Sequence, residues 1–369
     1  MSFKEECGIF GIWNHPEAAN LTYLGLYALQ HRGQESAGIA ATDGQHFHVE
    51  KAMGWVADVF HRERLKRLPG TRAIGHVRYS TAGTSTLKNA QPITANTARG
   101  PVALAHSGNL VNAEALKAEL EKDGAVFQSS SDTEVILHLL ARAAGSTLEE
   151  QLPQALGRVT GAYSLLILTP DALVAIRDPY GFRPLSLGKL GDAWIAASET
   201  CALDLLEARF VRDVEPGEMV FVTAEGLRSI KPFPPKERLQ CVFEYVYFSR
   251  PDSLLWGRNV PAVRKALGHQ LAREHPAQAD IVIPVPDSGM GAALGFSEES
   301  GIPFQVGLIR NHYVGRTFIE PAQGIRQFGV KVKLNPMRET LEGRRVVVVD
   351  DSIVRGTTSR KIVKMIRSA

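Results

Sequence analysis

The sequence has 369 residues, enough for two domains with full cores. Hydrophobic residues make up 44% and charged residues 22%, which is ordinary for a soluble globular protein. The formal net charge of +3 argues against a dedicated nucleic-acid binder. The start, Met-Ser-Phe-Lys-Glu-Glu, lacks the apolar core of a signal peptide, and no apolar run is long enough to span a membrane. We therefore expect a soluble, cytoplasmic protein with neither a nucleic-acid nor a membrane partner.

Short strand patterns dominate the chain before residue 231. They fall at Gly8–Trp13, Ala37–Thr42, Ala73–Tyr79, Val102–His106, Tyr163–Leu168, Ala172–Arg177, Trp194–Ser198 and Met219–Val222. Helical patterns lie among them at Leu21–His31, Ala113–Lys122 and Thr133–Ala144. Clustered strands with interspersed helices predict layered sheets covered by helices.

A proline-rich, charged stretch at 231–240 predicts a linker. Beyond it, strands and helices alternate. Strands are expected at Asp280–Val285, Phe304–Leu308 and Arg345–Val349, and helices near Val263–Glu274 and Gly291–Ser300. This rhythm is typical of βαβ units with a parallel sheet.

The most informative stretch is Val346–Ser359. Four valines that end in Asp350 and Asp351 indicate a strand buried on both faces. The small residues from Gly356 to Ser359 then lead into a helical pattern, and such a turn offers N–H groups and hydroxyls to an anion. The acidic pair suits ribose hydroxyls or a Mg²⁺ ion that carries a phosphorylated sugar. The plain alternative is a buried strand that ends in an aspartate N-cap.

This stretch resembles the phosphoribosyl-pyrophosphate (PRPP) motif of type I phosphoribosyltransferases. The resemblance implies that the two aspartates hold the ribose hydroxyls and that the small residues surround the 5′-phosphate. A second turn, which follows Ile281–Pro286, matches the pyrophosphate loop of that family, although an ordinary β-turn is the competing interpretation. A third stretch, Arg310–Ile319, resembles the loop that closes over bound PRPP. The PRPP-binding residues implied are Asp287, Ser288, Gly289, Arg310, Arg316, Asp350, Asp351, Arg355, Gly356, Thr357, Thr358 and Ser359, with Mg²⁺ at Ser288, Asp350 and Asp351. The basic residues Arg326, Lys331 and Lys333 extend this surface or form a solvated face.

Near the N-terminus, Cys7 precedes an apolar strand, and a lone cysteine in that place is usually a small buried hydrophobe. Four further motifs follow it in order. They are Gln30–Gly38, Gly75–Thr81, His106–Leu110 and Ser131–Glu134. Together they resemble the class II glutamine amidotransferases, whose nucleophile is an N-terminal cysteine. The free α-amino group of such a residue can act as its base, so the resemblance implies that residues 1–6 are a removable propeptide.

The resemblance also implies a glutamine pocket. Arg78 would bind the α-carboxylate and Asp132 the α-ammonium, while Gly33 and Thr81 would line the pocket. Arg78 as a solvated strand end is the alternative for that residue. For Asp132, the alternative is a helix start, because Ser131 and Glu134 have the spacing of a capping box.

One position departs from the family pattern. Class II amidotransferases usually carry His-Asn-Gly at the oxyanion position, where this chain has His106, Ser107 and Gly108. Asn109 comes two residues too late to replace the missing side chain directly. Since the loss of one oxyanion donor typically costs about 10²–10³ in rate, our hypothesis is that Ser107 weakens glutaminase activity.

A later motif, Cys241–Ser253, resembles an interdomain segment whose aromatic residues line a route for ammonia. In some relatives this cysteine binds a [4Fe–4S] cluster together with three others. The chain contains only Cys7 and Cys201 besides it, so we expect Cys241 to bind a cluster only if further sequence follows residue 369. Three cysteines without a CxxC pair also fit a reducing compartment.

The order of motifs resembles the glutamine PRPP amidotransferases, which join the two activities. We expect mixed α/β and α+β classes: a four-layer αββα N-terminal-nucleophile hydrolase domain at 7–232, then a Rossmann-like parallel-sheet phosphoribosyltransferase domain at 241–369, truncated at its C-terminus. The implied reaction turns glutamine, PRPP and water into 5-phosphoribosylamine, glutamate and pyrophosphate, the first step of de novo purine synthesis. Mg²⁺, feedback inhibition by purine nucleotides and a homotetramer are also implied.

Two alternatives remain open. One keeps the glutaminase but assigns another acceptor, such as the sugar of an isomerase domain, and PRPP binding would separate the two. The other is a non-catalytic regulator that senses PRPP or a nucleotide, which Ser107 and the early end of the chain favour.

Overall fold

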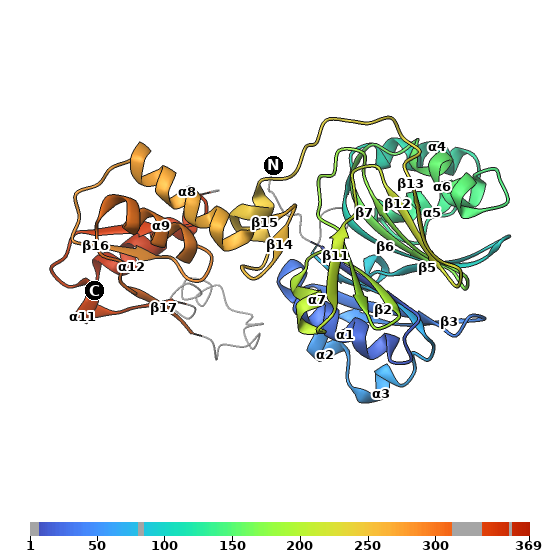
Figure 1. The fold of residues 1–369 in the computed structure, drawn as a ribbon, viewed down its shortest axis with the longest axis horizontal. Helices are drawn as coiled ribbons and strands as arrows, with labels where there is room; N and C mark the ends of the chain where they lie inside the picture. The colour runs from blue at the N-terminus through green and yellow to red at the C-terminus, as the bar shows by residue number, and fades with distance from the viewer. Residues whose placement is uncertain (1–6, 80–84, 312–333, 354–355) are drawn as a thin grey trace. The chain divides into compact units, whose positions relative to one another are not determined.

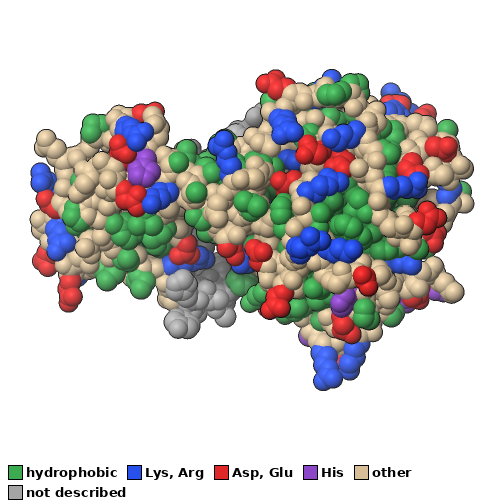
Figure 2. All heavy atoms as spheres, in the orientation of Figure 1, with side chains coloured by type: hydrophobic (Ala, Val, Ile, Leu, Met, Phe, Trp, Pro, Cys, Tyr) green, Lys and Arg blue, Asp and Glu red, His purple; other side chains and the backbone are tan. Residues whose placement is uncertain are grey.

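The computed structural model describes residues 7–79, 85–311, 334–353 and 356–369. These form two compact units, coloured along the chain in Figure 1. The larger unit runs to Val242 and includes Phe248–Gly257; the smaller comprises Phe243–Tyr247 and Arg258–Ala369. Among the described residues, no helix has the length and apolar character to cross a membrane. Figure 2 shows basic and acidic side chains interspersed over one face, in keeping with the small net charge.

The first sheet of the larger unit has seven antiparallel strands in the order β11-β9-β10-β1-β4-β2-β3. Its strands are β1 (Gly8–Trp13), β2 (Ser36–Thr42), β3 (Phe47–Met53), β4 (Arg72–Arg78), β9 (Ser186–Leu190), β10 (Ala193–Ala197) and β11 (Arg209–Asp213). Every residue of β1 is buried, as expected of a strand that lies between two neighbours in a covered sheet. The residue that precedes β1 is Cys7.

The second sheet has six antiparallel strands in the order β13-β12-β8-β7-β6-β5. They are β5 (Ile93–Thr97), β6 (Gly100–Leu110), β7 (Gly161–Leu168), β8 (Leu173–Arg177), β12 (Met219–Thr223) and β13 (Gly226–Ile230). Ile9 and Ile74 of the first sheet pack in one apolar cluster with Ala105 and Leu166 of the second. The two sheets therefore face each other across a shared core.

Helices cover the outer faces of both sheets (Figure 1). On the first sheet lie α1 (Ala18–Ala28), α2 (Val56–Val59), α3 (Arg62–Leu65) and α7 (Cys201–Leu205), and on the second lie α4 (Ala113–Lys122), α5 (Thr133–Arg142) and α6 (Leu148–Leu156). Short 3₁₀ turns occupy Gln30–Arg32 and Leu87–Asn89, and β14 (Leu254–Leu255) follows in the same unit. The result is a helix–sheet–sheet–helix arrangement.

The smaller unit is built on the parallel pair β16 (Ile281–Pro284) and β19 (Val346–Val349). Its other elements are β15 (Arg258–Asn259), α8 (Val260–Glu274), α9 (Met290–Ser300), β17 (Leu308–Arg310), β18 (Leu334–Pro336), α11 (Arg338–Leu341) and α12 (Thr357–Arg367). A π-helical turn spans Glu244–Phe248 and belongs to this unit up to Tyr247. Side chains of α12 pack on one face of the pair, and those of α8 and α9 pack on the other. This is the covered parallel arrangement that the alternating sequence pattern indicates.

Several predicted elements end one to four residues away from their expected bounds, and two of the differences change the local structure. The helix expected to reach His31 ends at Ala28, and the chain tightens into the 3₁₀ turn at Gln30–Arg32. The expected strand Phe304–Leu308 is wrong: only Phe304 bridges to Val282, and from Leu308 the backbone pairs instead with β18. For the strand, pairing with a distant segment, which the local pattern does not encode, decides where it lies.

Candidate functional site

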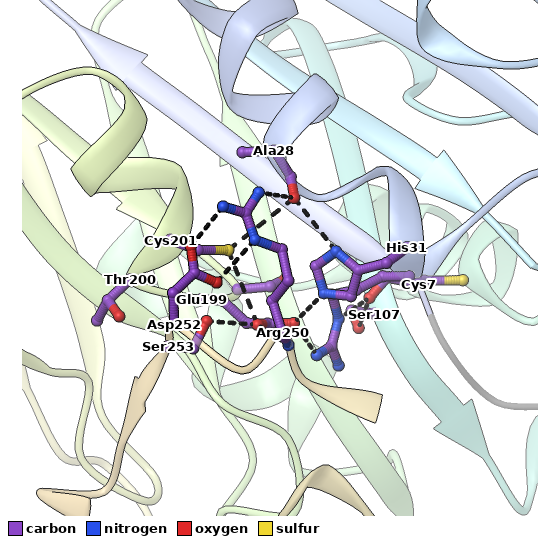
Figure 3. A network of polar contacts seen from close by, with 12 residues as sticks. Cys7, Ala28, His31, Ser107, Glu199, Thr200, Cys201, Arg250, Asp252 and Ser253 are labelled. Atoms are coloured by element: carbon purple, nitrogen blue, oxygen red, sulfur yellow. Dashed lines mark hydrogen bonds and ion pairs between the residues drawn. The ribbon is translucent and has the colours of Figure 1, made fainter. Parts of the chain in front are cut away.

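The main chain of Cys7 is held by two long-range hydrogen bonds. Its carbonyl oxygen accepts one from Arg32 Nε at 2.9 Å and another from Ser107 Oγ at 2.8 Å. Ser107 lies on β6, so its hydroxyl reaches Cys7 from the opposite sheet. In Figure 3 the sulfur of Cys7 points away from these contacts. The residue is therefore fixed at its carbonyl, while its thiol is directed elsewhere.

The thiol of Cys7 is buried and protonated at neutral pH. Burial raises its pKa to about 11, against the opposing effects of the Tyr79 backbone contact and the Arg78 charge. The sulfur lies 3.4 Å from the carbonyl oxygen of Tyr79, to which the S–H can donate. A nucleophilic role would therefore need a base that removes this proton during the reaction.

Arg78, the last residue of β4, is only 3% exposed. The alternative of a solvated strand end is therefore wrong. Its Nη1 lies 3.5 Å from Glu35 Oε2, and the backbone N–H of Glu35 donates to its carbonyl. The guanidinium is near enough to lower the pKa of Cys7, so a buried positive charge adjoins the thiol.

Asp132 places a negative charge near the same thiol. It is 7% exposed, directly precedes α5, and raises the pKa of Cys7 through its charge. One carboxylate oxygen accepts a hydrogen bond from the Leu110 N–H at 2.9 Å, and the other lies 3.8 Å from His106 Nδ1. Opposite charges beside Cys7 are the arrangement that would bind the α-carboxylate and α-ammonium of an amino acid.

The capping box expected from Ser131 and Glu134 is not formed. The Glu134 carboxylate turns back and accepts hydrogen bonds from the N–H groups of Gln128 and Ser129 and from the Ser129 hydroxyl. A reciprocal capping box exists at α6 instead, between Thr147 and Glu150. Asp132 is nevertheless the residue at which α5 begins, so the helix-start interpretation holds beside the ligand-binding one, without the capping box.

Two glycines let backbones approach closely near Cys7. A Cβ on Gly108 would lie 2.1 Å from the Ala162 carbonyl oxygen, and its φ of +145° also disfavours other residues. A Cβ on Gly33 would lie 2.5 Å from the carbonyl carbon of Val77, beside Arg78. Thr81, the remaining residue expected in the pocket, lies outside the described residues.

In the smaller unit, two loops meet at one edge of the parallel pair. Val285, just beyond β16, donates its N–H to the carbonyl of Val349, the last residue of β19, at 2.8 Å. A Cβ on Gly289 would lie 2.6 Å from the same carbonyl oxygen. The turn with Asp287 and Ser288 therefore lies next to Asp350, as parallel strands require of their carboxyl ends.

Asp350 and Asp351 form the acidic end of β19. Burial, and then the neighbouring charge of Asp351, raise the pKa of Asp350. Both groups would thus gain from a bound cation. A hydroxyl hydrogen bond of 2.7 Å links Ser352 to Asp351, and Gly356 begins α12 in a left-handed conformation. The first turn of α12 consists of the three predicted hydroxyl residues, Thr357, Thr358 and Ser359.

Arg310 also lies at this edge, where its Nη1 is 2.7 Å from Asp287 Oδ2 in an exposed ion pair. Arg316 and Arg355, together with Arg326, Lys331 and Lys333, fall outside the described residues.

Comparison with known proteins identifies the family. A family model for a glutamine amidotransferase domain matches residues 76–205. The amidophosphoribosyltransferase of Bacillus subtilis is 52% identical over 367 residues, which is 99% of this chain and 77% of that protein. The chain belongs to the amidophosphoribosyltransferase family. Members of this family are glycosyltransferases with a glutamine amidotransferase domain, and they make phosphoribosylamine in de novo purine biosynthesis.

Further relatives and solved structures belong to the same family or to purine biosynthesis. The chloroplastic amidophosphoribosyltransferase 1 of Arabidopsis thaliana is 54% identical over 99% of this chain, which spans 65% of that protein. A solved structure of an allosteric regulatory enzyme of purine biosynthesis superposes with a TM-score of 0.94 at 52% identity, over 98% of this chain and 78% of the other. The B. subtilis glutamine PRPP amidotransferase in complex with ADP and GMP gives a TM-score of 0.93 at 51% identity, over 98% of this chain and 79% of the other.

The donor atoms set limits on metal binding. Within the described parts of the chain, no three His, Cys, Asp or Glu side chains are grouped so that they could hold a metal ion. Cys7 and Cys201 are buried and Cys241 is half-buried. The three are one fewer than a four-cysteine cluster site needs. The pair Asp350 and Asp351 does suit Mg²⁺, because that ion is usually held by one or two carboxylates plus substrate phosphates.

Sequence reasoning missed the role of Arg32. Of the Gln30–Gly38 motif, only Gly33 was expected at the site, yet Arg32 is fully buried and donates to the Cys7 carbonyl oxygen. The residues around it, Gln30, His31, Gln34 and Glu35, are polar, so the local sequence gives no sign that Arg32 is buried.

We predict that alkylation of Cys7 by iodoacetamide rises steeply with pH while residues 1–6 are attached. Only the thiolate reacts, and with a pKa of about 11 the thiolate fraction grows about tenfold per pH unit up to that pKa. Peptide mass spectrometry between pH 7 and pH 10 measures the rate. Labelling of the buried Cys201 serves as the control for unfolding. A rate for Cys7 that levels off below pH 9 would contradict the buried, protonated thiol.

Proposed function

We propose that this chain carries out both halves of the amidophosphoribosyltransferase reaction, with a glutaminase domain at 7–232 and a phosphoribosyltransferase domain at 241–369. Ammonia released from glutamine at Cys7 would displace pyrophosphate from C1 of PRPP and give 5-phosphoribosylamine. The observation that carries the proposal is the placement of Arg78 and Asp132, with opposite charges, beside the buried Cys7. The family's own activity supports the same reaction.

In the donor half, the Cys7 thiolate would attack the side-chain amide carbon of glutamine. The tetrahedral intermediate then collapses, ammonia leaves with the added proton, and a thioester remains until water hydrolyses it to glutamate. We propose that residues 1–6 are removed, because the freed α-amino group of Cys7, with a pKa of roughly 7.7–8.0, would then be the base that the buried thiol needs.

The oxyanion of that intermediate needs hydrogen-bond donors. The Gly108 N–H and the Ser107 hydroxyl stand where the family has Gly and Asn, and Thr81 and Gly33 would complete the pocket. The Ser107 hydroxyl, however, already donates to the Cys7 carbonyl oxygen. We therefore propose that Gly108 supplies the main donor and that the serine contributes chiefly by holding Cys7.

In the acceptor half, Asp350 and Asp351 would bind the ribose hydroxyls and, with Ser288, Mg²⁺. A bound Mg²⁺ ion would neutralise negative charge on the departing pyrophosphate. Gly356 and the first turn of α12 offer backbone N–H groups and hydroxyls to the 5′-phosphate, at a helix N-terminus that favours anions. Asp287 and Gly289 would adjoin the pyrophosphate, and Arg310 could exchange its ion pair with Asp287 for the substrate. Arg316 and Arg355 would complete the contacts.

The chain's partners would be glutamine and PRPP, with purine nucleotides as feedback inhibitors. The structure of the B. subtilis relative in complex with ADP and GMP supports such regulation. A homotetramer and a cytoplasmic location follow from the resemblance and belong to the same proposal.

The reaction is tested by pyrophosphate release from Mg-PRPP in the protein that carries this chain. We expect turnover with glutamine and with an ammonium salt. Cys7→Ala should abolish turnover with glutamine and keep turnover with ammonium, because only the donor half is lost. Asp351→Asn should lower both activities, by on the order of 10²-fold if it removes a transition-state contact. No pyrophosphate from either nitrogen source would favour the non-catalytic sensor instead.

The departure at Ser107 yields a second prediction. Ser107→Asn should raise the kcat for glutamine hydrolysis by on the order of tenfold, because the longer amide can donate to the oxyanion. Arg32 would still hold the Cys7 carbonyl in this variant. Ser107→Ala is the matched control, and its rate should fall. Unchanged turnover in Ser107→Asn would contradict the hypothesis that serine limits the glutaminase.

A further inference from the structure

Glu199 is a buried carboxylate that contacts Cys7 indirectly, through Arg32, and has no part in the reaction described above. Glu199 is 0% exposed and follows β10. Its neighbour Ser198 exchanges two hydrogen bonds with Ile9 of β1: the Ile9 N–H donates to Ser198 Oγ and the Ser198 N–H donates to the Ile9 carbonyl, both at 3.0 Å. The segment that carries Glu199 is thus attached to the strand that follows Cys7. Figure 3 shows the contacts of the carboxylate.

One oxygen of Glu199 faces the nucleophile. Oε1 lies 2.7 Å from Arg32 Nη1 and 2.7 Å from His31 Nε2. Arg32 in turn donates from Nε to the Cys7 carbonyl oxygen at 2.9 Å. Glu199 and Cys7 therefore hold two edges of one guanidinium, whose planar set of donors fixes its orientation.

The other oxygen faces a different segment of the chain. Oε2 accepts hydrogen bonds from the Arg250 N–H at 2.9 Å and from Ser253 Oγ at 2.6 Å. Thr200 Oγ1 accepts another from the Leu254 N–H at 2.8 Å. The two carboxylate oxygens thus connect Arg32 to the main chain at Arg250–Leu254, all within the larger unit.

The charges explain why the carboxylate stays ionised. Burial alone would raise the pKa of Glu199, but the charges of His31 and Arg32, with the hydrogen bonds to the carboxylate, hold the pKa below its ordinary value. An ion pair between fully buried groups is costly to desolvate and is therefore weak evidence for stability by itself. What distinguishes this pair is its direct connection to Cys7.

We propose that Glu199 is a positioning residue for the nucleophile. It fixes the Arg32 guanidinium that holds the Cys7 carbonyl, and the Arg250–Ser253 segment fixes Glu199 through its second oxygen. If that segment shifted, Oε2 would lose its hydrogen bonds and the carboxylate could rotate. The Arg32 guanidinium, and with it the hydrogen bond to the Cys7 carbonyl oxygen, would then change position. This proposal depends on the nucleophilic role proposed for Cys7, and Glu199 itself touches neither substrate nor the thiol of Cys7.

The test replaces Glu199 with glutamine, which keeps the shape of the side chain. One carboxylate oxygen becomes an NH₂ group, which donates hydrogen bonds and cannot accept them. It must therefore lie against another donor, either the Arg32 guanidinium or the backbone N–H of Arg250. We expect kcat for glutamine hydrolysis to fall by on the order of 10- to 100-fold, as for a small misplacement of a reacting group. The KM for glutamine should stay within about threefold, because Arg78 and Asp132 keep their places.

Glu218→Gln is the matched control. Glu218 is also buried, at 2% exposure, and pairs with both Arg212 terminal nitrogens at 2.7 and 2.8 Å. Its contacts do not lead to Cys7. This variant should lose stability but keep the wild-type kcat. If both variants lost activity in proportion to their loss of melting temperature, Glu199 would be merely structural and the proposal would be overturned.

Ser253→Ala tests the second oxygen separately. It removes one donor to Oε2 and leaves the Arg32 side intact. We expect a smaller fall in kcat, and in combination with Glu199→Gln no fall beyond that of Glu199→Gln alone, since both act through one path. Wild-type kcat in Ser253→Ala, or full additivity in the double variant, would overturn the connection to Arg250–Ser253.

A readout that needs no turnover separates this inference from the proposed function. Hydrogen–deuterium exchange should be faster in Glu199→Gln for the peptides with Cys7 and with Arg32, and unchanged there in Glu218→Gln. If the wild-type protein does not hydrolyse glutamine, the proposed function fails while exchange still decides the positioning role. Exchange at Cys7 equal to that of the wild-type protein would overturn it.

Discussion

The site depends on how the carbonyl of Cys7 is held between the two sheets. The residue belongs to the first sheet through β1, yet one of its two hydrogen-bond donors, Ser107, comes from the second sheet. The other donor, Arg32, comes from the 3₁₀ turn that follows α1. The packing of both sheets and of the first helix layer therefore converges on one peptide group. A nucleophile fixed this way has little freedom to lose when substrate binds, which favours reaction.

Burial gives the site its electrostatic character. Arg32, Arg78, Asp132 and Glu199 are all within a few per cent of full burial, so their charges act with little screening by water. Each has an assigned neighbour: Arg32 pairs with Glu199, Arg78 adjoins Glu35, and Asp132 accepts from the Leu110 N–H. The same burial keeps the Cys7 thiol protonated, and the proposed removal of residues 1–6 would supply the α-amino group as its base.

The sequence predicted the buried parts of the fold best. Gly8–Trp13 was predicted with its observed bounds, because an uninterrupted apolar run marks a strand covered on both faces. The half-exposed strands β3 and β11 and the edge strand β13 were missed, since charged residues such as Glu50, Arg212 and Arg228 break the apolar pattern there. The Ser131–Glu134 spacing is that of a capping box, but Glu134 instead accepts hydrogen bonds from the N–H groups of Gln128 and Ser129.

At the site, too, the sequence predicted some residues and missed the contacts of others. Motif order predicted Cys7, Arg78 and Asp132, and the structure brings these three together, since both charged groups act on the thiol. The contacts of Arg32 and Glu199 could not be predicted, because 167 residues separate the two partners. Only folding brings such groups into contact.

The most direct test of the account is peptide mapping after reaction with 6-diazo-5-oxo-L-norleucine, an electrophilic analogue of glutamine. We expect a single adduct, on Cys7, carried by a chain whose first residue is Cys7, with labelling prevented by excess glutamine. An adduct on Cys201 or Cys241, or labelling of Cys7 that glutamine does not prevent, would contradict the assignment of this pocket and of its nucleophile.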